Sequence, residues 1–117
     1  MKTSHNLEIT RKFINALEEK KAIDITLIDI HEVASFTDYF IICSGTSDRM
    51  LRSLVQTIKE IAKEVFNNKG RVIGIPSNGW IAVDLGFIVL HLFSPEQRAY
   101  YDLEDLWSDG KVLLKIS

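Results

Sequence analysis

The stretch that decides the fold spans residues 37–65 and reads TDYFIICSGTSDRMLRSLVQTIKEIAKEV. Residues 39–43 form a short, largely aromatic and β-branched run that is apolar on both faces, as expected of a strand in the middle of a sheet. From Leu51 onward, apolar residues recur at spacings of three and four, which predicts an amphipathic helix. Thr46 or Ser47 can cap the first free amides of that helix. A buried strand, a turn and an amphipathic helix in this order indicate an α/β domain.

The sequence on either side of this stretch predicts further helices and strands. The predicted elements are, in chain order, a helix over residues 4–20, strands over 25–30 and 39–43, the helix described above, strands over 71–75, 80–85 and 87–93, and one or two short helices that begin at Ser94. The last three strands are separated by short turns, which favours an antiparallel meander. Gln97 is placed to reach back to the capping Ser94. We therefore predict one α/β domain over residues 1–117, with a mixed five-stranded sheet flanked by helices.

Length and composition fit a globular domain that needs no disulfide or metal to fold. The chain has 117 residues, of which 46% are hydrophobic and 26% are charged, and its one cysteine, Cys43, has no partner for an internal disulfide. No segment reaches the ~18 apolar residues of a membrane span, and the N-terminus lacks a signal peptide pattern. We therefore expect a cytoplasmic protein. The net charge of -2, with basic residues spread among acidic ones, argues against nucleic acid as the main contact.

Residue patterns for catalysis or metal binding are largely missing. The turn at residues 44–47 (SGTS) lies between a strand and a helix, where phosphate can bind, but it lacks the glycines and the lysine of a phosphate-binding loop. Two-metal nucleotidyl transfer needs carboxylates at positions i and i+2 of one strand, and the sequence has no Asp-x-Asp pair. Cys43 is expected to pack as a small apolar residue. His5, His31 and His91 lie far apart without nearby ligands, so no metal or cofactor is predicted.

Aromatic and acidic residues in the last third of the chain are the candidates for an interaction surface. Trp80 shares a strand face with Ala82 and Asp84, which suits a half-exposed anchor as well as a core position. Residues 100–107 (YYDLEDLW) mix rings with charges, so they can form an interface or dock a helix on the sheet. The acidic residues of this region form either a solvated face or a complement to a basic protein, and they are Asp102, Glu104, Asp105 and Asp109.

His91 stands out because it interrupts an apolar strand. By strand parity it shares a face with Phe87, Val89 and Phe93. Two interpretations remain open. The first is a buried histidine that is hydrogen-bonded to a tyrosine or an aspartate, and the second is a histidine that faces a partner.

Three segments of the chain together carry a family resemblance. They are residues 37–49 (TDYFIICSGTSDR), residues 80–93 with Asp84, Gly86 and His91, and residues 100–107 (YYDLEDLW). In this order and spacing, over residues 7–107, the chain resembles the ribosomal silencing factor family, also called Iojap-like. The resemblance implies a fold similar to that of nucleotidyltransferases, without their catalytic carboxylates and without enzymatic activity.

The same resemblance implies a repressor of translation. The family is understood to bind the large ribosomal subunit through its ribosomal protein L-fourteen, which blocks joining of the small subunit and lowers translation when nutrients are short. The contact residues that the resemblance implies are Trp80, Asp84, Leu85, His91, Tyr100 and Tyr101.

Two departures from the family pattern lie next to these residues. Phe87 follows Gly86 where many members carry an acidic residue, and the loop over residues 76–79 is shorter than the usual acidic one. Three alternatives stay open at this point. They are a small nucleotide-binding enzyme of the nucleotidyltransferase type that uses the turn at residues 44–47, direct binding to ribosomal RNA, and a homodimer.

Overall fold

The computed structural model describes residues 2–68 and 70–117, with side chains from residue 6 onward. Its helices are α1 (Lys2–Glu19), α2 (Asp48–Phe66), α3 (Pro95–Tyr101) and α4 (Leu103–Leu106), and a short 3-10 helix, η1, spans Pro76–Asn78. Its strands are β1 (Ile23–Asp29), β2 (Tyr39–Ser44), β3 (Arg71–Ile73), β4 (Trp80–Asp84), β5 (Ile88–Phe93) and β6 (Lys111–Ile116).

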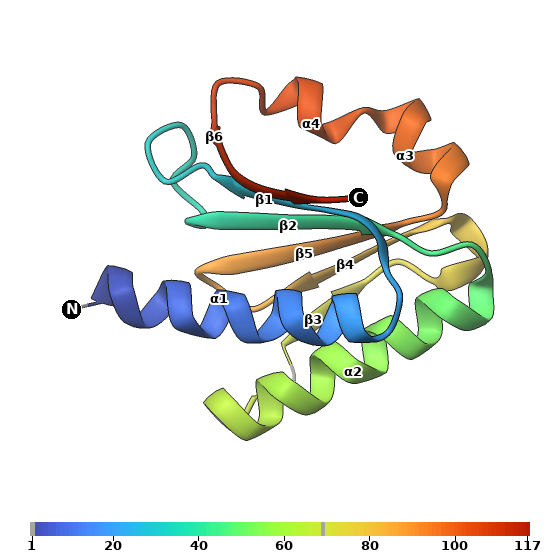
Figure 1. Ribbon diagram of the computed structural model, residues 1–117, viewed down its shortest axis with the longest axis horizontal. Helices are drawn as coiled ribbons and strands as arrows, with labels where there is room; N and C mark the ends of the chain where they lie inside the picture. Colours follow the sequence, from blue (N-terminus) through green and yellow to red (C-terminus); the bar gives the residue numbers. More distant parts are fainter. Residues whose placement is uncertain (1, 69) are drawn as a thin grey trace.

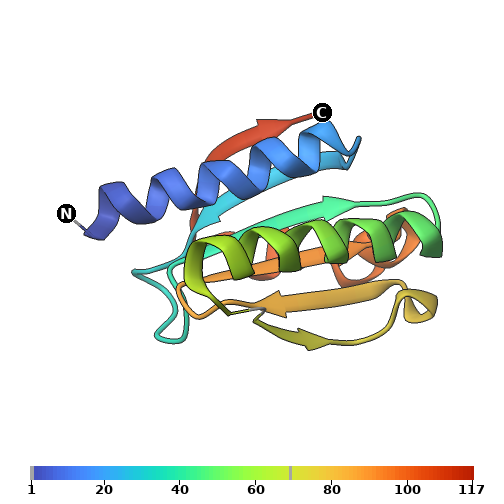
Figure 2. The same cartoon turned by 90° about the horizontal axis from the view of Figure 1, so that it is seen from below.

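Helices cover both faces of a single mixed sheet. α1 and α2 lie side by side on one face, and α3 and α4 lie across the other (Figures 1 and 2). The strand order is β3-β4-β5-β2-β1-β6, in which β2 and β5 are parallel and the other neighbours are antiparallel. Within residues 2–68 and 70–117, no helix is both long and apolar enough to cross a membrane.

The sheet separates two apolar clusters of different size. The larger cluster lies between the sheet and the helices α1 and α2, and it buries Phe13 and Leu17 of α1 together with Leu54 and Ile58 of α2. The smaller cluster lies on the other face and includes Leu103, the first residue of α4. β2 and β5 are buried along their whole length because they carry apolar side chains toward both clusters. The expectation of a central strand over residues 39–43 is confirmed.

The predicted meander and both predicted helix starts are confirmed. β3, β4 and β5 are successive antiparallel neighbours. Ser47 Oγ accepts a hydrogen bond from the N–H of Met50 at 3.1 Å, and Ser94 Oγ accepts one from the N–H of Gln97 at 3.2 Å. The N–H of Ser94 donates to the carbonyl of Gly79 at 2.9 Å, so it is satisfied from another turn and not by the side chain of Gln97.

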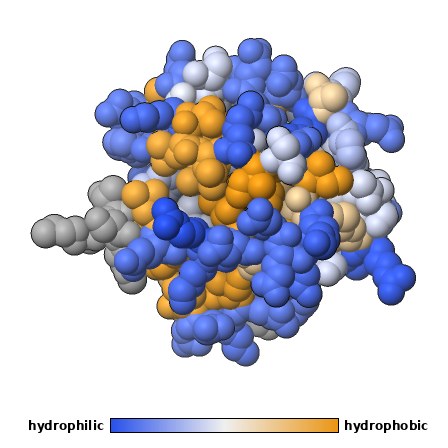
Figure 3. All heavy atoms as spheres, viewed as in Figure 1, coloured by the Kyte–Doolittle hydropathy of each residue, from blue (hydrophilic) through white to orange (hydrophobic). Residues whose placement is uncertain are grey.

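The sheet has six strands among the described residues, where the sequence predicted five. The additional strand, β6, pairs with β1 from Ile25 opposite Ile116 to Asp29 opposite Lys111. Its residues are exposed at nearly every position, so it lacks the alternation of a half-buried strand. β6 is an edge strand of the sheet and lies on the side that faces the viewer in Figure 1. Figure 3, in the same view, shows apolar surface in the middle of this side. Pairing with β1, which is distant in the chain, makes this segment a strand.

The turn between β4 and β5 changes the position of Phe87. β5 begins one residue after Phe87, whose ring packs against Phe66 of α2 with 5.6 Å between the centroids. The prediction that Phe87 shares a face with His91 is therefore wrong. Parity holds only inside a strand, and Gly86, with φ +94°, reverses the chain directly before Phe87.

Candidate functional site

The sheet face opposite α1 and α2 is only partly covered. α3 lies next to β5, and the α3–α4 segment extends from there over the middle of the sheet (Figure 1). On β4, the residues that point toward α2 are buried. Those on the opposite face are half-buried, namely Trp80, Ala82 and Asp84. This part of the sheet therefore presents side chains to the outside.

Five rings, here called the aromatic cluster, gather at one end of this open face: Trp80, His91, Phe93, Tyr100 and Tyr101. The indole of Trp80 stacks on Phe93 with 5.0 Å between the centroids, and it lies 4.5 Å from the ring of Tyr101. Tyr100 meets Tyr101 edge-on at 5.1 Å. Tyr100 is 78% exposed and Tyr101 is 46% exposed. Exposed rings supported from below are typical of protein interaction surfaces.

A close approach between two turns brings Trp80 beside Tyr101. Gly79, which precedes β4, has φ +76°, and a Cβ at this position would lie 2.6 Å from Cγ of Gln97 and 2.7 Å from Oγ of Ser94. The carbonyl of Gly79 accepts the N–H of Ser94 at 2.9 Å. A glycine is therefore required for the start of β4 to contact the start of α3.

His91 is buried underneath the other rings of the aromatic cluster. It is 7% exposed, and the ring of Phe40 meets the imidazole edge-on at 4.5 Å. The indole Nε1–H of Trp80 donates a hydrogen bond to Nδ1 of His91 at 3.2 Å. Burial lowers the pKa of His91 to about 4, so the imidazole is neutral at neutral pH. Of the two interpretations from the sequence, the buried histidine matches the structure, with Trp80 as its partner in place of a tyrosine or an aspartate.

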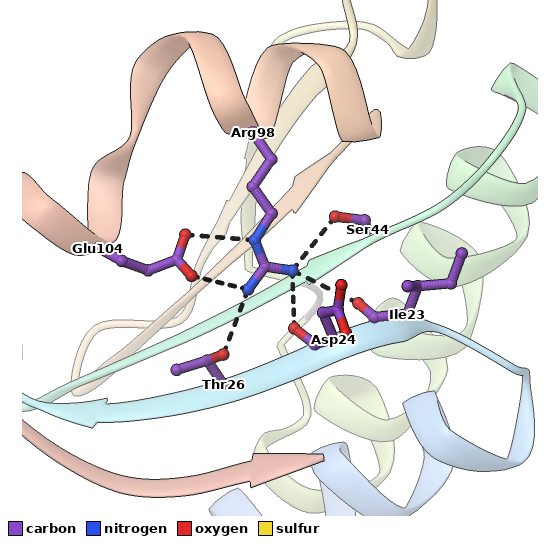
Figure 4. Close-up of polar contacts among 6 residues, drawn as sticks. All are labelled: Ile23, Asp24, Thr26, Ser44, Arg98 and Glu104. Carbon is purple, nitrogen blue, oxygen red and sulfur yellow. Dashed lines mark hydrogen bonds and ion pairs between the residues drawn. The ribbon is translucent and has the colours of Figure 1, made fainter. Parts of the chain in front are cut away.

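Arg98 fixes the position of α3 (Figure 4). Its side chain is 12% exposed and pairs with Glu104 through Nε to Oε1 at 3.2 Å and Nη2 to Oε2 at 2.9 Å. Its Nη1 also donates to the carbonyl of Asp24 at 2.7 Å and to Oγ of Ser44 at 3.2 Å, and Nη2 donates to Oγ1 of Thr26 at 3.2 Å. One side chain thus ties α3 to α4, β1 and β2, and it holds the two tyrosines of α3 in place.

Asp84 and Leu85 lie apart from the aromatic cluster. Asp84 is on the same face of β4 as Trp80 but at the other end of the strand, where its Oδ1 accepts the N–H of Gly86 at 2.9 Å. Leu85 packs against the larger apolar cluster, on the side of α1 and α2. The structure therefore brings together four of the six contact residues that the sequence predicted, which are Trp80, His91, Tyr100 and Tyr101.

Comparison with known proteins identifies the family. The family described as "Ribosomal silencing factor during starvation" matches residues 3–116. The chain belongs to this family.

Relatives match most of the length of this chain. "Ribosomal silencing factor RsfS" of Halalkalibacterium halodurans is 33% identical over 105 residues, which are 90% of this chain and 90% of that protein. "Mitochondrial assembly of ribosomal large subunit protein 1" of Mus musculus is 35% identical over 98 residues, which are 81% of this chain and 43% of that protein. A crystal structure of a Chromobacterium violaceum protein matches with a TM-score of 0.77 and 32% identity, covering 87% of this chain and 85% of that one. The family expected from the sequence is confirmed.

Two residues that build the candidate site, Phe93 and Arg98, were not predicted from the sequence as site residues. Phe93 supports the indole of Trp80, and its signal was available, because strand parity places it on the face of His91. Arg98 has no comparable signal. Its acceptors on β1 and β2 are 54 to 75 residues away in the chain, so their meeting is a result of the tertiary fold.

The polar groups of the turn between β2 and α2 are bonded within the protein. The N–H of Gly45 donates to the carbonyl of Phe93 at 2.9 Å, and Ser47 caps α2. Oγ of Ser44 accepts from Arg98. These contacts give no support to the alternative of a nucleotide-binding enzyme.

The remaining candidate nucleophile is buried, and the potential metal ligands whose side chains are described do not form a group. Cys43 is fully buried, and burial raises the pKa of its thiol to about 12, so the reactive thiolate is disfavoured. The described side chains include no group of three or more His, Cys, Asp and Glu residues that could hold a metal ion. The side chain of His5 lies outside the described ones.

Proposed function

We propose that this ribosomal silencing factor binds the large ribosomal subunit through ribosomal protein L-fourteen and blocks joining of the small subunit. It then lowers translation in the cytoplasm when nutrients are short, as a steric inhibitor and not as an enzyme, and it needs no cofactor. The observation that carries the proposal is the aromatic cluster, whose tyrosines are exposed, in a chain of this family. The name of the mouse relative, which mentions the large ribosomal subunit, also supports the choice of subunit.

The rings of the aromatic cluster have the properties of a binding hot spot. Tyrosine and tryptophan supply a large contact area at a small cost in side-chain entropy. Trp80 is already held by Phe93 and Tyr101, so little of its freedom is left to lose when a partner binds. We place the contact on Trp80, Tyr100 and Tyr101, with His91 beneath them and with Asp84 as the rim at the far end of β4, whereas Leu85 packs on the other side of the sheet. A contact of about 800 Å² per partner is enough for a stable complex.

Exposed acidic residues that follow α3 favour a basic partner. Asp102, Asp105 and Asp109 follow α3 and are exposed, whereas Glu104 is paired with Arg98. Exposed charges at the border of an interface mainly raise the rate of association with an oppositely charged partner. A basic ribosomal protein matches this requirement better than another acidic surface.

The test is light scattering of a mixture of purified large and small ribosomal subunits. Adding the protein to the large subunit first is expected to reduce the scattering increase that accompanies subunit joining. Co-sedimentation with each subunit alone identifies the target, and binding is expected for the large subunit and not for the small one. Unchanged subunit joining at a saturating concentration of the protein would contradict the proposal.

A further inference from the structure

A hydrogen bond across two strands sets the orientation of the indole in the aromatic cluster. Trp80 lies opposite Phe93 and His91 lies opposite Ala82, so Trp80 and His91 are diagonal neighbours on one sheet face. The indole Nε1–H can only donate, so Nδ1 of His91, at 3.2 Å, must carry the lone pair. The proton of the neutral imidazole is therefore on Nε2.

Apart from its hydrogen bond to Trp80, the imidazole of His91 destabilises the folded state at this position. Nε2 of His91 is buried and has no hydrogen-bond partner within the described part of the chain. An unpaired buried donor is unfavourable, and the neighbours on β2 and β5, Phe40 and Phe93, are apolar rings. Burial is the sole cause of the lowered pKa of His91, with no contribution from a charged neighbour. An aliphatic residue would fill this place at a smaller cost, so the bond to Trp80 is what the histidine provides.

The aromatic contacts of Trp80 do not replace this bond. Phe93 stacks on the indole and Tyr101 lies against it at a tilted angle, and neither of these ring contacts is directed at the indole N–H. Turning the ring over would move Nε1 away from His91 and present a different edge of the indole to the outside. The hydrogen bond therefore restrains the direction of the indole N–H, which the ring contacts alone do not do.

We infer that His91 is a positioning residue for the recognition of ribosomal protein L-fourteen, because its Nδ1 fixes the orientation in which Trp80 meets the partner. The inference rests on the proposed function. His91 itself stays buried beneath Trp80, so it acts through the indole and not by touching the partner.

The test compares three variants by calorimetric titration with purified ribosomal protein L-fourteen. His91→Leu removes the acceptor and keeps an apolar side chain, and it is expected to weaken binding about tenfold. His91→Gln offers an amide oxygen as acceptor and is expected to restore part of the affinity. Val89→Ala, on the same face of β5, loses packing in the same apolar cluster without touching the bond, and it is expected to bind as the parent does.

Nuclear magnetic resonance of the indole N–H of Trp80 reports on the bond itself, with Trp107→Phe used to assign the two indole signals. In the parent, this signal is expected to shift with a midpoint near pH 4, the pKa of His91, because protonation of Nδ1 removes the acceptor. In His91→Leu the signal is expected at a shifted position and without this titration. Val89→Ala is expected to keep both the position and the titration.

The outcomes distinguish the positioning role of His91 from the proposed function. Parental affinity in His91→Leu, together with a shifted indole signal, would overturn the positioning role and leave the proposed function standing. Equal losses of affinity in His91→Leu and Val89→Ala would reduce His91 to a packing residue and would also overturn it. If the parent itself does not bind ribosomal protein L-fourteen, the proposed function fails, and the positioning role in this recognition fails with it.

Discussion

Trp80 combines a role in packing with a proposed role in binding, because its indole is half-buried. The indole packs on Phe93 and Tyr101 and donates a hydrogen bond to His91. Trp80 therefore combines features of both interpretations from the sequence, a half-exposed anchor and a core residue. A half-buried anchor is rigid before a partner arrives, and a rigid anchor loses less entropy on binding than a mobile one.

Replacing Trp80 by alanine is expected to affect both binding and stability. Loss of an interface tryptophan typically costs ~2 kcal/mol or more, about thirtyfold in affinity for the large subunit. The lost ring contacts with Phe93 and Tyr101 are expected to lower the free energy of unfolding by about 2 kcal/mol, less than for a fully buried tryptophan. Co-sedimentation and urea unfolding measure the two effects. A variant that binds as well as the parent would move the interface away from β4.

Tyr100→Ala separates binding from stability at the same site. Tyr100 is 78% exposed, so its removal is expected to change the free energy of unfolding by less than about 0.5 kcal/mol. Its affinity for the large subunit is expected to fall about tenfold if the ring belongs to the interface. Leu113→Ala, on β6 at the opposite edge of the sheet, is the matched control and is expected to keep parental affinity. Equal affinities of the two variants would contradict the assigned surface.

At the scale of elements, Arg98 joins the short helices to the sheet. α3 and α4 have seven and four residues, too few to be stable as isolated helices in water. The guanidinium of Arg98 connects both of them to the ends of β1 and β2 through side-chain and carbonyl oxygens. The position of the two tyrosines of α3 therefore depends on one buried cation.

Arg98→Met is expected to lower the free energy of unfolding by about 3 kcal/mol, because it leaves Glu104 and the carbonyl groups of Ile23 and Asp24 without their partner. Urea unfolding measures this loss, and amide hydrogen exchange is expected to become faster in α3 and α4 than in β5. The double variant Arg98→Met with Glu104→Met removes the unpaired carboxylate and is expected to regain part of the stability. A loss below about 1 kcal/mol in the single variant would show that packing alone holds α3.

At the scale of the whole molecule, the charge distribution bears on the choice of partner. The chain carries 14 basic and 16 acidic residues, and the acidic residues Asp102, Asp105 and Asp109, which follow α3, are exposed. A surface of this kind would release few counterions from phosphate. The salt dependence of binding therefore discriminates between a protein contact and direct contact with ribosomal RNA.

The affinity for the large subunit is therefore expected to depend weakly on salt. Between roughly 50 and 200 mM salt, a protein that contacts 6–10 phosphates loses about 10³- to 10⁵-fold in affinity. We expect a loss of less than about tenfold, measured by co-sedimentation over this range. A steep slope, or equal affinity for naked ribosomal RNA and for the intact subunit, would favour RNA as the direct contact.

The sequence by itself determined the order of the elements up to the short helices after Ser94, the central strands and the family. Residues 39–43 are apolar at every position and α2 has a continuous apolar stripe, and both patterns are local. Ser47 and Ser94 also cap their helices as predicted, because capping involves residues two or three positions apart. The chemistry of Trp80, Tyr100 and Tyr101 as candidate contact residues was likewise visible without a structure.

The tertiary structure alone decided which of these residues meet. β6 is a strand because β1 supplies its hydrogen bonds, and its own exposed residues show no alternation. Trp80 and His91 are joined across two strands, and Arg98 finds acceptors up to 75 residues away. Such contacts depend on strand register and on the packing of α3, which local patterns in a sequence do not encode.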